Sequence, residues 1–146
     1  MNYMFLPLQR YADFNGRSRR MEYWMFVLFQ VIVYFVLNLV LGMMFATSMP
    51  LPSEIGPDGQ MSPDAAAGMF AAMGPMLLVY CVVGLALLLP NLAVTVRRFH
   101  DQDKTGWLVL LALIPFVGGL IVLVFMLLPG TVGDNRYGPD PKQADI

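Results

Sequence analysis

Three clusters of polar residues hold the side chains of this sequence that could do chemistry. The first runs from Gly16 to Trp24 and contains Arg17, Arg19 and Arg20. Guanidinium groups can pair with phosphate through parallel hydrogen bonds, and aromatic residues such as Trp24 suit the boundary between a bilayer and water. This pattern is typical of the anchor of a membrane helix, and it also allows recognition of an anionic lipid headgroup.

The second cluster runs from Arg97 to Trp107 and contains the single histidine. His100 beside Asp101 suggests acid/base catalysis, but adjacent residues of a helix point in different directions and no nucleophile is identifiable nearby. Arg97 and Asp101 have the i,i+4 spacing of a weak ion pair on a helix surface. One histidine and one cysteine give no metal-ligand spacing. We therefore expect no catalytic residue, no metal and no cofactor.

The third cluster, between Gly130 and Pro141, is rich in glycine and proline and predicts tight turns. Asn135 can bond to the neighbouring backbone in such a turn. The glycines lack the order of a phosphate-binding loop and follow no strand, so nucleotide binding is not indicated. We expect no nucleic-acid partner either.

These clusters give two sets of candidate site residues. The candidates for an interface that binds anions are Arg17, Arg19, Arg20, Arg97, Arg98 and His100. The candidates for structural partners are Glu22, Asp101, Trp24, Trp107, Asn135 and Tyr137. If the first two clusters lie at one membrane face, Glu22 and Asp101 should pair with arginines, because paired charges near the interface cost less than lone ones.

The elements that must position these clusters are membrane helices. Hydrophobic residues make up 58% of the 146 residues and charged residues 13%, against about 45–50% and 25% in ordinary globular domains. The charges are clustered, and each of three gaps between them exceeds the roughly 20 residues that cross a hydrocarbon core. We predict an all-α integral membrane domain with spans at residues 23–45, 76–96 and 107–128, an outer loop at 47–68 and a polar tail at 130–146.

Two proline-containing stretches complicate the spans. Pro90 predicts a kink near the inner end of the second span. Pro115, Gly118 and Gly119 could divide the third segment into two halves, which would return the tail to the side where the segment began. We favour a single kinked span there, since irregular backbone at membrane depth must be buried in protein or line water. The re-entrant arrangement is the alternative.

Orientation follows from the lysines and arginines, which resist translocation. They gather before the first span and between the second and third, so these segments and the N-terminus are expected in the cytoplasm. The loop at 47–68 has no lysine or arginine and is expected outside. A single third span would place the tail outside, although Arg136 and Lys142 weaken that prediction.

Two shorter helices are predicted at the edges of the spans. Residues 5–14 can form an interfacial helix with one apolar face. Ser62, Pro63 and Asp64 give a helix-start pattern of a cap, a first-turn proline and an acidic residue. We expect that helix to reach about Met73 and to lead into the second span.

In order along the chain, the three clusters resemble the bacterial small inner-membrane proteins grouped as domain of unknown function 805. The residues that carry the resemblance are Phe14, Gly16, Arg17, Arg19, Glu22, Tyr23 and Trp24; Arg97, Arg98, His100, Asp101, Gly106 and Trp107; and Gly130, Asn135, Tyr137, Gly138, Asp140 and Pro141. The resemblance covers the chain except the outer loop, which is long here. It implies a multi-pass protein of the bacterial cytoplasmic membrane and no established activity.

Three hypotheses about function follow. We favour a non-enzymatic membrane module that binds lipid headgroups or a protein partner through an arginine-rich cytoplasmic face. The second is an oligomeric channel or transporter component, with Asn38, Pro90 and Asn91 along a path. The third is an interfacial enzyme acting on a lipid or phosphate ester through His100. Membrane lipids, anionic ones included, and a homo-oligomer or another membrane protein are the expected partners.

Overall fold

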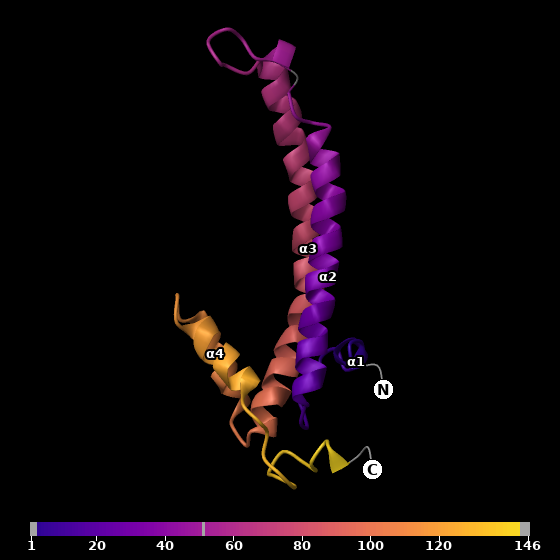
Figure 1. The fold of residues 1–146 in the computed structure, drawn as a ribbon, viewed down its shortest axis with the longest axis vertical. Coiled ribbons are helices and arrows are strands. Elements are labelled where there is room, and N and C mark those ends of the chain that lie inside the picture. Colours follow the sequence, from indigo (N-terminus) through magenta and orange to yellow (C-terminus); the bar gives the residue numbers. More distant parts are fainter. Residues whose placement is uncertain (1–2, 51, 144–146) are drawn as a thin grey trace. The chain divides into compact units, whose positions relative to one another are not determined.

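The computed structural model describes residues 3–50 and 52–143, and every regular element in these ranges is a helix. In chain order they are α1 (Leu6–Gln9), α2 (Arg20–Ala46), the 3-10 helix η1 (Pro52–Glu54), α3 (Pro63–Asp101), the 3-10 helix η2 (Gly106–Leu113) and α4 (Gly118–Leu127). Figure 1 labels the four α-helices. The predicted all-α fold is therefore confirmed. Leu51 of the predicted outer loop and residues 144–146 of the predicted tail lie outside the described residues.

Two of the helices, α2 and α3, are long and apolar enough to cross a membrane. The predicted spans at 23–45 and 76–96 fall within them. The 39 residues of α3 give a length of about 58 Å at 1.5 Å per residue. A hydrocarbon core is about 30 Å thick, so α3 is about twice as long as a perpendicular span requires.

The start of α3 agrees with its sequence pattern, but its continuation does not. The hydroxyl oxygen of Ser62 accepts a hydrogen bond from the backbone N–H of Ala65 at 3.2 Å, as expected of a cap. The prediction of a separate short helix ending near Met73 is wrong, because α3 continues through both Pro75 and Pro90. Each proline removes one backbone donor, a loss that membrane helices tolerate.

The predicted interfacial helix is shorter than expected. It consists of the single turn α1, and the chain leaves the helical conformation at Arg10. The guanidinium of Arg10 donates two hydrogen bonds to the carboxylate of Asp13, at 2.9 and 2.7 Å. That carboxylate also accepts the backbone N–H of Asn15 at 3.0 Å. These side-chain bonds stabilise a turn where we had predicted more helix.

The prediction of one kinked helix over residues 107–128 is wrong, because the chain reverses in the middle of this segment. η2 and α4 pack against each other and are joined by a tight turn in which Phe116 has a φ of 64°. The backbone N–H of Val117 bonds to the carbonyl of Pro115 at 2.7 Å within this turn. At about 15 Å each, neither arm is long enough to cross a hydrocarbon core. We call residues 106–127 the apolar hairpin.

A close contact between the two arms explains the position of one glycine. A Cβ atom at Gly118 would collide with the backbone carbonyl of Leu111 on the other arm. A Cβ atom at Gly119 would meet nothing within 4 Å. The first glycine therefore permits the hairpin, whereas the second is not required by its surroundings.

The structure divides into two compact units. The charged unit comprises residues 1–30 and 87–146, and the apolar unit comprises residues 31–86. The apolar unit contains no lysine or arginine, and most large apolar side chains on its helices are exposed, as expected of a lipid-facing surface. The charged unit has a small apolar core of Phe99, Val122 and Met126.

Candidate functional site

The carboxylate of Asp101, at the end of α3, is the centre of the polar network in the charged unit. Its Oδ1 accepts a hydrogen bond from Arg17 Nε at 3.0 Å, and its Oδ2 accepts one from Arg98 Nη1. The side chains of Asp101 and Arg17 are 5% and 1% exposed. The carboxylate offsets the cost of burying these two cations, although it neutralises only one of them.

Arg17 also ties the polar tail to the end of α3. Its Nη2 donates to the carbonyl of Thr131 at 2.7 Å, and its Nη1 donates to that of Gly133 at 2.6 Å. The backbone N–H of Thr131 in turn donates to the carbonyl of Asp101 at 2.8 Å. The planar guanidinium thus joins three segments that are distant in the sequence.

A second buried ion pair joins α3 to α2. Arg97 Nη2 lies 3.1 Å from Glu22 Oε1, and the two side chains are 0% and 4% exposed. Among the described residues, none of the three guanidinium nitrogens of Arg97 has a hydrogen-bond partner, and neither does Glu22 Oε1, so the two side chains interact as an ion pair without a hydrogen bond. The expected surface pair of Arg97 with Asp101 does not form, because both side chains are buried with other partners.

The remaining arginines of the first cluster bind backbone carbonyls. Arg19 donates to the carbonyl of Pro141. Arg20, which is exposed, donates to that of Leu127 at 3.3 Å. Arg98 donates in the same way to the carbonyl of Leu128. These contacts and the burial of Arg17, Arg97 and Arg98 mean that the expected open arginine-rich surface does not form at those three residues.

The polar tail is held in a compact turn by Asn135. Its Nδ2 donates to the carbonyl of His100 at 2.9 Å and to the hydroxyl of Thr131 at 3.0 Å. Its Oδ1 accepts the backbone N–H of Tyr137 at 2.9 Å. The side chain that predicted a turn therefore also fixes that turn to the end of α3.

Asp140 closes the same turn and was not among the candidate residues. Its carboxylate accepts the backbone N–H groups of Lys142 and Gly133, at 3.0 and 3.1 Å. The pKa of Asp140 is lowered from its ordinary value of 3.8, mainly by the hydrogen bond from Lys142 and further by the one from Gly133. An acidic residue followed by proline could have indicated this role, since such residues favour turns.

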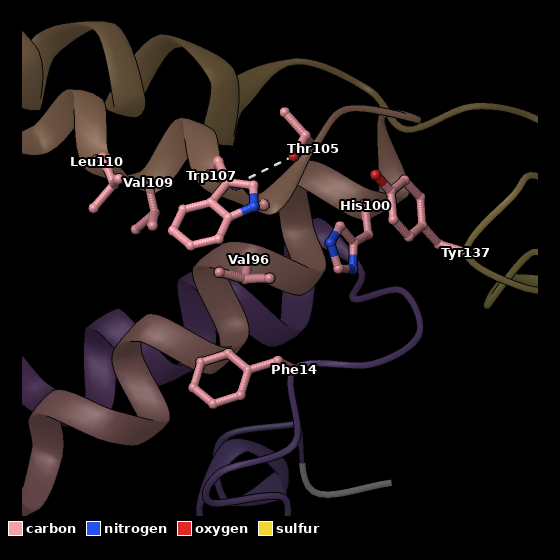
Figure 2. Close-up of a pocket in the computed structure, with 9 residues that line it drawn as sticks. Phe14, Val96, His100, Thr105, Trp107, Val109, Leu110 and Tyr137 are labelled. Atoms are coloured by element: carbon pink, nitrogen blue, oxygen red, sulfur yellow. Dashed lines mark hydrogen bonds between the residues drawn. The ribbon is translucent and has the colours of Figure 1, made fainter.

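An open groove lies beside this network, and most of its lining belongs to α3 and η2. It has a volume of about 530 Å³, and Figure 2 shows eight of its lining residues with labels. The lining residues are Phe14, Val96, His100, Thr105, Gly106, Trp107, Val109, Leu110 and Tyr137. The sequence predicted three of them as candidates, His100, Trp107 and Tyr137, without indicating a groove.

The orientation of His100 is fixed by two contacts. Its ring stacks on that of Tyr137, with centroids 3.8 Å apart and planes 4° from parallel. Its Nδ1 lies 3.3 Å from the carbonyl oxygen of Gly16. Because a carbonyl only accepts, Nδ1 carries a proton, and the free nitrogen of the neutral ring is Nε2. Asp101, which the sequence places next to His100, binds Arg17 and Arg98. Among the described residues, its carboxylate forms no hydrogen bond with the imidazole ring.

The two tryptophans of the sequence have different surroundings. Trp24 packs against the apolar core of the charged unit and meets Tyr23 edge to face, with centroids 5.5 Å apart. Trp107 is 76% exposed and lines the groove. Its backbone N–H donates to the hydroxyl oxygen of Thr105 at 3.4 Å, which caps η2.

Comparison with known proteins places the chain among bacterial membrane proteins. The family model described as protein of unknown function (DUF805) matches residues 11–139. The inner membrane protein YhaH of Escherichia coli strain K12 is 39% identical over 142 residues, which cover 97% of this chain and 98% of the relative. The inner membrane protein YhaI of the same strain is 37% identical over 142 residues, covering 97% of each chain. No solved structure matches the chain.

Proposed function

The chain belongs to the DUF805 family, and we propose that it is a multi-pass inner-membrane protein whose charged unit binds a membrane lipid. In this proposal the protein is a binding module and not an enzyme. The observation that carries it is the open groove beside His100. The two E. coli relatives are named as inner membrane proteins, which supports the location.

The proposed topology has two complete spans and one re-entrant segment. α2 and α3 cross the bilayer, and the apolar hairpin enters it from the side on which α3 ends. The lysines and arginines of the N-terminal segment and of the connection after α3 favour a cytoplasmic position for both. Hydrogen bonds from Gln102 to the carbonyl of Phe125 and from Thr131 to that of Asp101 support a return of the tail to this same side.

The composition of the groove suits a lipid. Its walls are largely aliphatic and aromatic, and no charged side chain of the described residues lines it. Trp107 and Leu110 are 76% and 50% exposed, so the groove is open along an apolar edge. Such a groove can receive a chain from the bilayer while Thr105 and Tyr137 provide hydrogen-bonding groups.

The arginines have a different part in this proposal from the one that their sequence pattern suggested. Each guanidinium of Arg17 and Arg98 already binds the Asp101 carboxylate and backbone carbonyls. We therefore assign these two side chains to positioning the tail and the hairpin around the groove. A headgroup would have to displace buried hydrogen bonds to reach them, at a cost of several kcal/mol.

The alternatives have less support from the contacts of their named residues. Asn38, expected along a channel path, donates its side-chain amide to the carbonyl of Tyr34 at 2.7 Å on its own helix. The enzyme hypothesis required an acid/base group beside an anion site, but Arg97 and Arg98 are engaged internally. Arg136, whose guanidinium lies over the Tyr137 ring, is paired with Asp103. Neither alternative is favoured by a specific observation.

Native mass spectrometry of the full chain, released mildly from bacterial membranes, tests the proposed function. Leu110→Trp places a larger side chain in the groove, and Leu113→Trp makes the same change on η2 at a residue that is 77% exposed and outside the groove lining. We expect wild type and Leu113→Trp to retain lipid and Leu110→Trp to lose most of it. Equal retention in all three, or a lipid-free closed oligomer of wild type, would overturn the proposal.

A further inference from the structure

The ring nitrogen Nε2 of His100 determines which hydrogen-bonding group a ligand in the groove should carry. Nδ1 donates to the carbonyl of Gly16, so Nε2 of the neutral ring is an acceptor. Nε2 has no hydrogen-bond partner among the described residues, and it faces Gly106, where a Cβ atom would lie 3.1 Å from it. Burial lowers the pKa of His100 from its ordinary value of 6.5, so at neutral pH the ring is mostly neutral and Nε2 accepts a hydrogen bond. A matching ligand therefore carries a hydroxyl group that can donate.

The charge of the lining limits the ligand further. Among the described residues, the polar side chains in the groove are those of His100, Thr105, Trp107 and Tyr137, all neutral in their ordinary forms at pH 7. The cation beside this lining is Arg136, 4.9 Å from the centroid of the Tyr137 ring, and it is already paired with Asp103 at 3.1 Å. A phosphate in the groove would therefore have to compete with that carboxylate. Burying a charge without a partner is costly, so the head of the ligand is expected to be uncharged.

The types of side chain that line the groove suit a flat head and a single tail. Aromatic rings of Phe14 and Trp107 line it, and Figure 2 shows the His100 ring beside that of Tyr137. Aromatic rings pack well against one another through offset or edge contacts. Val96, Val109 and Leu110 provide the aliphatic part of one continuous groove, which suits one chain better than the two chains of a glycerolipid.

From these three properties we propose that the groove binds an amphiphile with one apolar tail and an uncharged, hydroxyl-bearing ring, the chemistry of an isoprenoid quinol. One ring hydroxyl donates to His100 Nε2, and the hydroxyl of Tyr137 donates to a ring oxygen. This ligand assignment rests on the proposed lipid-binding function. It involves binding alone, and no electron or proton transfer is part of it.

Calorimetric titration of the full chain in nanodiscs tests the assignment, with empty nanodiscs as the blank. The probes are 2-decylhydroquinone and its dimethyl ether, which has the same ring and tail but cannot donate. Wild type is expected to bind the hydroquinone about three- to tenfold more tightly than the ether, the effect of one net hydrogen bond. His100→Phe keeps a flat ring against Tyr137 and should reduce this ratio to near one.

The possible outcomes separate this inference from the proposed function. Equal affinity of wild type for both probes, an unchanged ratio in His100→Phe, or no binding of either probe would overturn the quinol assignment. If lipid retention still depends on Leu110 in those cases, the lipid-binding function stands. Preferential binding of dioleoylglycerol over the hydroquinone would overturn the single-tail argument. Should His100→Phe fail to fold, the two probes on wild type still decide the question.

Discussion

The charged unit and the apolar unit use the same two long helices, yet their side chains are organised in opposite ways. In the apolar unit large hydrophobic residues such as Phe35 and Leu85 are 66% and 67% exposed. In the charged unit Arg97 and Arg98 are fully buried. Lipid is as apolar as leucine, so hydrophobic burial contributes little to joining helices within a bilayer. In the charged unit, hydrogen bonds and ion pairs therefore fix the positions of the segments, and the candidate site lies in this unit.

Of the substitutions we propose, removal of the carboxylate of Asp101 should destabilise the charged unit most. Asp101→Asn leaves Arg17 and Arg98 buried without an anionic partner, and we expect it to cost about 3–5 kcal/mol of unfolding free energy. Denaturant unfolding of the full chain in detergent, followed by circular dichroism, measures this loss. Asp103→Asn is the matched control, because its pair with Arg136 has side chains 46% and 59% exposed. That control should cost less than about 1 kcal/mol; equal losses would contradict the central role of Asp101.

A double-mutant cycle on Arg97 and Glu22 measures how much the stability of the charged unit depends on this buried ion pair. Arg97→Met alone leaves the carboxylate of Glu22 buried and unpaired and should cost several kcal/mol. Adding Glu22→Leu replaces the pair by apolar groups, and we expect the double variant to recover at least about 2 kcal/mol. The same unfolding assay supplies all four corners of the cycle. Additive losses would show that the two side chains do not depend on each other.

The apolar hairpin offers a pair of adjacent glycines that test close packing without a change of charge. Gly118→Ala should cost about 1–3 kcal/mol, because its new methyl group meets the carbonyl of Leu111. Gly119→Ala has open space and higher helix propensity, so it should be neutral or slightly stabilising. Thermal unfolding of both variants makes the comparison. A similar shift for the two would mean that the arms do not approach as closely as the structure has them.

The smallest expected effect concerns Asp140 and depends on pH. Its pKa is lowered in the folded chain, first by the backbone N–H of Lys142 and then by that of Gly133. Its contribution to stability is therefore present above its ordinary pKa of 3.8 and is lost as the pH falls through the lowered value. We expect Asp140→Asn to speed amide exchange in the tail a few-fold at pH 7. In acid, exchange corrected for intrinsic rates should become equal to wild type; a pH-independent difference would contradict this.

Much of the fold could be predicted because apolar length and clustered charge are properties of the chain itself. The helices at 23–45 and 76–96 follow from two long segments without charge. The pairing of Glu22 and Asp101 with arginines follows from the cost of an unpaired charge near a membrane. The turn at Asn135 likewise follows from a side chain that bonds to its own neighbouring backbone.

The rest depends on contacts between distant segments. The reversal within residues 107–128 requires Gly118 to meet Leu111, and apolar composition is the same for a span and for a hairpin. The choice of Arg17 rather than Arg97 as partner of Asp101 depends on how the segment before α2 lies against the end of α3, where Ser18 also donates to the carbonyl of Arg97. The groove was not predictable, because the sequence suggests only a membrane anchor at Phe14 and a lipid-facing position for Leu110.

The apolar hairpin has a consequence for how the protein is made. Under the proposed topology, the insertion machinery exports one polar segment, the loop between α2 and α3, and that loop carries no lysine or arginine. The segment after the hairpin, with Arg136 and Lys142, stays on the side where the ribosome releases it. The tail therefore need not cross the bilayer before it folds onto Arg17 and closes the charged unit.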